Sequence, residues 1–263
     1  MLSVYLKFLK KNVTWGIIPP LILSFFVPLL GSFWTAMLPE IENFSKLLEN
    51  PIYDVFLGST SSFNFTDWTG FYYIELFTFL ELVIIFTVIL VPTRLITSEL
   101  DNNTFDLILS YPISRWRYIF EKFCVFLTYN LLYPVFILIL TYQTIISLNV
   151  EMNLVLLLYS LFGVWMIMFS LGSLSLLCGV IFFESNRSLA ASGIIVLSQY
   201  ILVRIGSISN SLSYLKNYSI FNYLTAHTIV TSQKIPLYDL FIVSSIGISA
   251  LIFSLIIIEE KEF

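Results

Sequence analysis

Long, unbroken runs of apolar residues dominate the pattern along this chain. A helix rises about 1.5 Å per residue, so crossing the roughly 30 Å hydrocarbon core of a bilayer takes about 20 mostly apolar residues. The runs are continuous and do not alternate strictly with polar positions, which favours helices over the strands of a membrane barrel. The sequence therefore predicts six transmembrane helices, over Trp15–Met37, Tyr72–Ile96, Ile119–Leu148, Leu154–Phe182, Leu189–Ile205 and Leu237–Ile258.

Composition supports the same class. Of 263 residues, 58% are hydrophobic and 11% are charged, whereas a soluble domain carries about 25% charged residues. The net charge of −4 gives no basic footprint for nucleic acid, so no nucleic-acid partner is expected. We predict an all-α polytopic membrane protein embedded in membrane lipid, with residues 1–263 forming a single transmembrane domain. Cys124 and Cys178 fall near cytoplasmic ends of predicted spans, where a reducing environment predicts free thiols.

The distribution of lysine and arginine predicts the orientation. Cytoplasmic loops of membrane proteins carry an excess of these residues. A cytoplasmic amino terminus followed by six crossings puts nine of the lysines and arginines inside and four outside. We therefore expect a multi-pass protein of the cell membrane with both termini in the cytoplasm. The outside set is Lys46, Arg204, Lys216 and Lys234.

The segment Gly206–Pro236, on the predicted outer side, is too long for a turn and too apolar for a plain loop. Its tyrosines suit the membrane interface, where a ring buries its body and keeps its hydroxyl in water. We predict one or two short outer helices before the sixth span, lying in the interface or re-entering the bilayer.

Residues that carry enzyme chemistry are scarce. His227 is the single histidine, no HExxH pair occurs, and no Gly-rich loop precedes a lysine and a serine or threonine. Such a chain has no phosphate cradle for ATP and no histidine-rich metal site. The expectation is no catalytic residue, no metal site and no cofactor in this chain, so that driven transport would need a partner's ATPase.

The connection Val91–Tyr118, between the second and third predicted spans, combines charge with apolar residues. Asn103 can cap a short helix that begins at Thr104, and Pro112 ends the pattern. Acidic rather than basic residues line the polar side of this helix, which favours docking into a protein groove over lying on lipid.

An ordered set of residues in this connection resembles a family pattern. The set is Ser98-Glu99, then Asn103 through Ser110, then Pro112-Ile113-Ser114-Arg115, and finally Lys122. It is similar to the membrane subunits of ABC-2-type transporters, the type V exporter fold, and especially to the nitrous-oxide-reductase maturation permeases. Pro51–Gly58 and Leu212–Tyr223 resemble outer segments of the same family. Two departures are Asn103, where glycine is usual, and Ile220, where proline is frequent.

The resemblance implies a permease subunit of an ATP-binding-cassette exporter. A second copy or a related permease would complete the pathway, and a separate cassette subunit docking on the cytoplasmic side would bind ATP and Mg²⁺. The residues that would contact or position the cassette subunit are Glu99, Thr104, Phe105, Asp106, Leu107, Ile108, Leu109, Pro112 and Arg115.

Two carboxylates fall inside the second predicted span. A carboxylate in hydrocarbon costs several kcal/mol unless it is protonated, paired or hydrated. For Glu81 the alternatives are a substrate pathway, a structural hydrogen bond or a water-exposed position, and Glu75 is near enough to the outer end to reach water. Both are candidate pathway residues, and Arg204 is a candidate ion-pair partner for Glu75, at similar predicted depth.

Two other functions compete with transport. A membrane anchor that recruits a cytosolic ATPase or assembles an outer complex would need the same docking segment but would tolerate mutation of Glu81. An intramembrane enzyme is disfavoured by the missing reactive groups. No residue of the pattern identifies a substrate.

Overall fold

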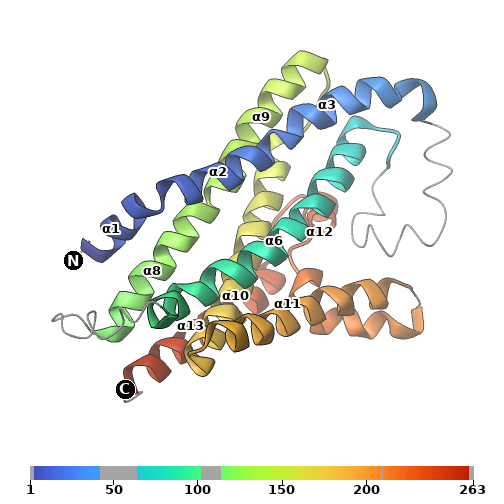
Figure 1. Cartoon of the computed structure of the whole chain (residues 1–263). Coiled ribbons are helices and arrows are strands. Elements are labelled where there is room, and N and C mark those ends of the chain that lie inside the picture. The colour runs from blue at the N-terminus through green and yellow to red at the C-terminus, as the bar shows by residue number, and fades with distance from the viewer. Residues whose placement is uncertain (1–2, 42–63, 102–113, 209, 261–263) are drawn as a thin grey trace.

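The computed structural model describes residues 3–41, 64–101, 114–208 and 210–260, and these parts of the chain are built from helices (Figure 1). Six segments within them are long and apolar enough to cross a membrane, which confirms the number predicted. These segments are Gly16–Glu40, Trp68–Asp101, Arg115–Leu148, Leu154–Phe182, Ser185–Ser207 and Leu237–Glu260.

The first and third spans are composite. The first consists of α2 (Val13–Ser24), α3 (Phe26–Met37) and the 3-10 turn η1 (Leu38–Glu40). Pro19 and Pro20 lie inside α2, and a proline removes a backbone donor from a helix. The third span joins α8 (Arg115–Asn130) to α9 (Leu132–Leu148) through Leu131.

A short helix not predicted from the sequence precedes the first span. Helix α1 (Ser3–Lys11) packs against α8. Its backbone N–H at Tyr5 donates to Glu121 at 3.0 Å, and the Tyr5 hydroxyl bonds Thr128 at 3.0 Å. These bonds attach the start of the described chain to the third span.

Helix α10 (Leu154–Phe182) occupies the middle of the bundle (Figure 1), where it packs against α6 (Trp68–Asp101), α9, α11 (Ser185–Ile208) and α13 (Leu237–Glu260). Small residues on α10 allow this close approach. A Cβ added at Gly179 would lie 3.0 Å from the Thr93 carbonyl oxygen of α6, so the two backbones come close only because glycine stands there. Close packing at small residues is a principal source of helix association in lipid.

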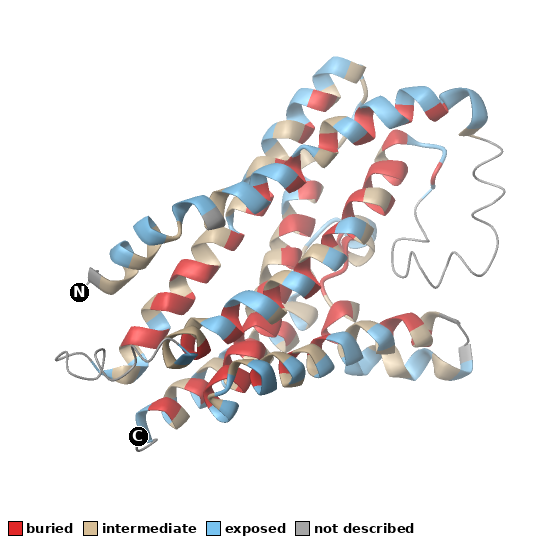
Figure 2. Ribbon diagram, in the orientation of Figure 1, coloured by how far each residue is buried: buried red, intermediate tan, exposed pale blue. Residues whose placement is uncertain are grey.

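Many residues on the outward faces of the bundle are exposed (Figure 2), and large apolar side chains are prominent among them. Phe86 on α6, Ile194 on α11 and Phe241 on α13 are each at least 65% exposed. Lipid tails are as apolar as these side chains, so in a bilayer the exposed side chains would contact lipid without an energetic penalty.

The segment between α11 and α13 contains three short helices, where one or two were predicted: η3 (Asn210–Tyr218), η4 (Ile220–Asn222) and α12 (Ala226–Ser232). Helix η3 folds back along α11. Gln199 of α11 holds the turn, because its side-chain oxygen accepts from the Ile220 N–H at 2.9 Å and its carbonyl accepts from the Ser219 hydroxyl at 2.6 Å.

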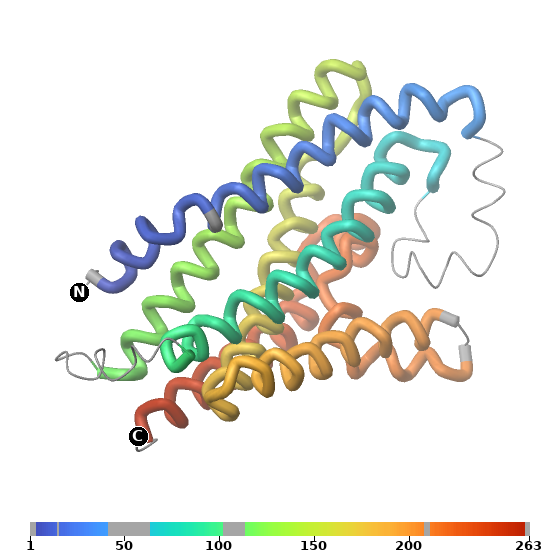
Figure 3. The backbone as a smooth tube through the Cα atoms, in the orientation of Figure 1, coloured from blue at the N-terminus to red at the C-terminus, as the bar shows by residue number. Residues whose placement is uncertain are grey.

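The amino end of α1 and the carboxyl end of α13 lie at the same end of the bundle, as six crossings require (Figure 3). Helix α6 ends there and α8 begins there (Figure 1). We call this the terminal end of the bundle.

Both cysteines, Cys124 and Cys178, are free thiols.

Candidate functional site

The connection between α6 and α8 is the segment that the sequence assigns to a partner. Its central residues, Thr104, Phe105, Asp106, Leu107, Ile108, Leu109 and Pro112, lie outside the described residues. Glu99 and Arg115 flank it and are described. The candidate site is therefore built from the two helix ends that hold this connection.

Lys122 of α8 joins these two helix ends. Its ammonium group, 2% exposed, donates to a carboxylate oxygen of Glu99 and to the Leu95 carbonyl oxygen, both on α6. The Tyr118 hydroxyl donates to the same Glu99 oxygen at 2.5 Å. A buried lysine without a counter-charge would be strongly destabilising, so this pair fixes the spacing of α6 and α8. We call these four residues the Lys122 cluster.

Helix α1 covers the Lys122 cluster from one side. The Phe8 ring packs edge-on to Tyr118, with centroids 5.9 Å apart. The Lys122 ammonium lies 4.6 Å from the Phe8 centroid and 4.9 Å from the Tyr118 centroid, within the range of cation–π attraction. Three helices thus meet at one buried charge.

Glu99 has a role inside the chain that its sequence assignment did not include. Its side chain is 13% exposed and its carboxylate is bonded to Lys122 and Tyr118. Contact between Glu99 and a partner stays a prediction. The sequence held one hint of this contact, because Glu99 and Lys122 both belong to the family pattern. The pattern was not interpreted as a contact between them.

The start of α8 is held by the last span. Ser114 stands at the N-cap position, but its side chain makes no capping bond. The Trp116 N–H instead donates to a carboxylate oxygen of Glu259 on α13 at 3.1 Å. Arg115 is the first residue of α8 and is partly buried. The far end of the connection is therefore tied to α13.

A second buried ion pair lies deeper in the bundle. A guanidinium nitrogen of Arg204, on α11, donates to a Glu81 carboxylate oxygen on α6, and the two side chains are 8% and 16% exposed. The Tyr200 ring lies 4.8 Å from the guanidinium carbon. The predicted pairing of Arg204 with Glu75 is wrong.

Helix lengths explain that correction. Arg204 lies 19 residues after the start of α11, and Glu81 lies 20 residues before the end of α6. The two helix ends from which these distances are counted lie toward the same end of the bundle (Figure 1). The charges therefore sit at one depth, while Glu75 is about 9 Å farther along α6. Glu75 is half-buried.

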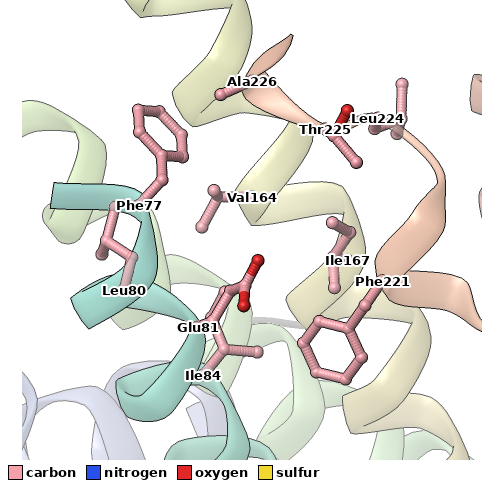
Figure 4. A pocket seen from close by; sticks show the side chains of 10 residues that line it. All are labelled: Phe77, Leu80, Glu81, Ile84, Val164, Ile167, Phe221, Leu224, Thr225 and Ala226. Carbon is pink, nitrogen blue, oxygen red and sulfur yellow. The ribbon is translucent and has the colours of Figure 1, made fainter. Parts of the chain in front are cut away.

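Glu81 also lines a small cavity between α6, α10 and the segment that follows η3 (Figure 4). Its carboxylate points into the space between Val164, Ile167 and Phe221. The cavity has a volume of about 30 Å³, enough for one or two water molecules. Its lining is Phe77, Leu80, Glu81, Ile84, Val164, Ile167, Phe221, Leu224, Thr225 and Ala226.

One wall of the cavity depends on a tight backbone approach. Leu224 has φ of 53°, in the left-handed region that is unfavourable for a leucine. Its carbonyl oxygen lies close to α10, and a Cβ added at Gly163 would stand 2.7 Å from that oxygen. Thr225 then caps α12 by accepting from the Thr228 N–H at 3.2 Å. The cavity wall thus relies on glycine at position 163.

Comparison with protein families matches residues 5–258 to the ABC-2 family transporter protein. Neither the curated proteins nor the solved structures give a match. The match does not distinguish the nitrous-oxide-reductase branch within the family. It covers five of the six membrane-crossing segments completely and the sixth up to residue 258, together with both ion pairs described above. The chain therefore belongs to the ABC-2 family, whose members are membrane components of transporters.

Proposed function

We propose that this chain is the permease subunit of an ATP-driven exporter in the cell membrane. A separate ATP-binding cassette subunit would bind ATP and Mg²⁺ and dock at the terminal end of the bundle, which faces the cytoplasm. One chain supplies six spans, so a second copy or a related permease would complete the pathway. Family membership supports the permease role, and the excess of lysine and arginine supports the orientation.

The Lys122 cluster is the observation that carries the proposal. It braces the end of α6 against the start of α8, while the Trp116–Glu259 bond ties α8 to α13. A connection held by a buried ion pair on one side and by an exposed hydrogen bond to α13 on the other would pass a displacement on to the helices. The cassette subunit would bind the segment Thr104–Leu109, with Phe105, Leu107 and Ile108 as apolar anchors.

The mechanism follows from differential contacts. When two cassettes close around ATP, they would carry the attached connections with them. The braced pair α6–α8 would then move as a unit, shifting the population from one packing of the spans to another. Glu81 and Glu75 on α6 are the pathway residues that this motion would displace.

Co-purification with a cassette ATPase tests the docking role. The partner to use is the product of a neighbouring gene that carries the GxxxxGK[ST] phosphate loop. Phe105→Asp is expected to abolish co-purification and the permease-dependent stimulation of ATPase activity in nanodiscs, with membrane insertion unchanged. The matched control is Phe263→Asp, the same substitution outside the docking segment, which should behave like wild type. Full coupling in Phe105→Asp would refute the docking assignment.

A further inference from the structure

The Arg204 guanidinium has more donors than this chain satisfies. Arginine carries N–H groups on Nε, Nη1 and Nη2. Nη2 donates to Glu81, but Nε and Nη1 are buried and have no hydrogen-bond partner among the described residues. The residue as a whole is 7% exposed. A buried donor without an acceptor destabilises the fold, and a charged donor does so more strongly.

The surroundings of Arg204 combine this unmet charge with apolar surface. Tyr200 covers the guanidinium and packs edge-on to Phe221, with ring centroids 5.9 Å apart. Phe221 in turn lines the cavity that Glu81 enters, together with Leu80 and Leu224. Arg204 itself does not line this mainly apolar cavity, but its ion-pair partner Glu81 does.

We propose that Arg204 is the receptor for an oxyanion, a carboxylate or phosphate group on an amphiphilic substrate, with Glu81 as the counter-ion that it displaces. Oxygen acceptors of the anion would satisfy the Nε and Nη1 donors, and an arginine–oxyanion pair is among the stronger hydrogen-bonded pairs. The apolar part of the molecule would lie along the Phe221 and Leu224 side of the cavity. This rests on the proposed permease function, whose substrate class it names.

The volume of the cavity adds a condition. About 30 Å³ admits one or two waters but no amphiphile. Binding therefore requires the walls of the cavity, formed by α6, α10 and the segment from Phe221 to Ala226, to move apart. Exchange of Glu81 for the substrate anion removes one of the contacts that hold α6 to α11.

Binding of dodecyl phosphate to the purified full chain in a neutral maltoside detergent tests this inference. Saturable binding to wild type is expected. Arg204→Gln should weaken this binding at least tenfold, because it removes a charged hydrogen bond. A tenfold loss of affinity corresponds to about 1.4 kcal/mol. Glu81→Gln should strengthen it, because the internal competitor is gone. Arg187→Gln and Glu184→Gln are the matched controls, since they neutralise an exposed ion pair and should leave binding unchanged.

The opposite signs of the two variants separate a receptor from a structural brace. A brace would lose stability in both variants and alter binding in neither. If Arg204→Gln fails to fold, the double variant Glu81→Gln/Arg204→Gln, which leaves no unpaired charge at this site, takes its place in the test. It should bind dodecyl phosphate more weakly than Glu81→Gln alone. The inference is overturned if wild type shows no saturable binding or if variants lacking Arg204 bind as wild type does.

Inorganic phosphate as a second probe distinguishes the source of the anion. Binding of dodecyl phosphate alone supports a membrane amphiphile, whereas equal competition by inorganic phosphate contradicts the amphiphilic part of the assignment. The assay needs no ATPase. If cassette docking fails while Arg204-dependent binding is retained, the proposed coupling is refuted and the anion site stands. If docking succeeds while wild type shows no saturable binding, the anion site is refuted and the coupling stands.

Discussion

Lys122 of α8 and Glu99 of α6 form a buried ion pair that ties together the two helices on either side of the proposed docking segment. The pair is 23 residues apart in sequence but in direct contact in the fold. Breaking such a pair from one side leaves an uncompensated buried charge, which costs about 3–5 kcal/mol.

Lys122→Met is therefore expected to lower the thermal unfolding temperature sharply. Glu99→Gln/Lys122→Met, which removes both charges, should recover most of that loss, because a buried pair replaced by neutral groups is often nearly neutral. Thermal unfolding of the four proteins of this double-mutant cycle measures the coupling. Additive losses would show that the two charges do not depend on each other.

The approach of the Leu224 carbonyl to Gly163 predicts the effect of a single methyl group. Gly163→Ala should destabilise by about 1–3 kcal/mol, because the new Cβ meets a backbone oxygen that cannot move aside by a rotamer change. Gly193→Ala on α11 is the control, since nothing lies within 4 Å of its Cβ position. It should stabilise by up to about 1 kcal/mol through helix propensity. Equal effects of the two substitutions on the unfolding temperature would contradict the packing described.

The buried Tyr72–Thr141 hydrogen bond predicts an asymmetric pair of effects. The Thr141 hydroxyl donates to the Ile137 carbonyl at 2.7 Å, so Tyr72 must be the donor to Thr141. Tyr72→Phe leaves Thr141 with its helix bond and should cost about 1 kcal/mol. Thr141→Val strands the fully buried Tyr72 hydroxyl and should cost about 1–3 kcal/mol. Free energies of unfolding measured in mixed micelles show which of the two variants loses more stability. A larger loss in Tyr72→Phe than in Thr141→Val would show that Tyr72 is not the donor.

Cysteine labelling tests the proposed orientation. In a background with Cys124 and Cys178 replaced by serine, Arg187→Cys should react with a membrane-impermeant maleimide only after cells are opened. Lys234→Cys should react in intact cells. Both side chains are exposed in the structure, so access depends on the side of the membrane. Labelling of Arg187→Cys in intact cells would invert the topology.

The six spans could be predicted because hydrocarbon thickness dictates a length that the apolar runs display directly. Helix α1 was missed, although Val4 and Phe8 stand four residues apart and both pack against the core. Its pattern is short and adjoins a longer apolar run. An amphipathic helix of nine residues is stabilised by the surface it packs against, and that surface is not visible in the sequence.

Partners across helices were harder to predict than the helices themselves. Arg204 was assigned to Glu75 because depth was judged from the predicted outer ends, and those ends do not lie level. Lys122 was interpreted as a cytoplasmic positive charge and as the last residue of the family pattern, whereas the fold buries it almost completely. Periodicity gives the face of a residue on its own helix, but the choice among neighbouring helices depends on tilt and register.

Helix α6 runs for 34 residues, with Pro92 inside it and no interruption. Glu81 and Glu99 are carried on this one rod, separated by 18 positions, or about 27 Å of rise. If α6 tilts as one unit, a displacement at Glu99 also displaces Glu81. In the proposed mechanism, the length of this single helix would couple a movement at Glu99 to a displacement of Glu81 from Arg204.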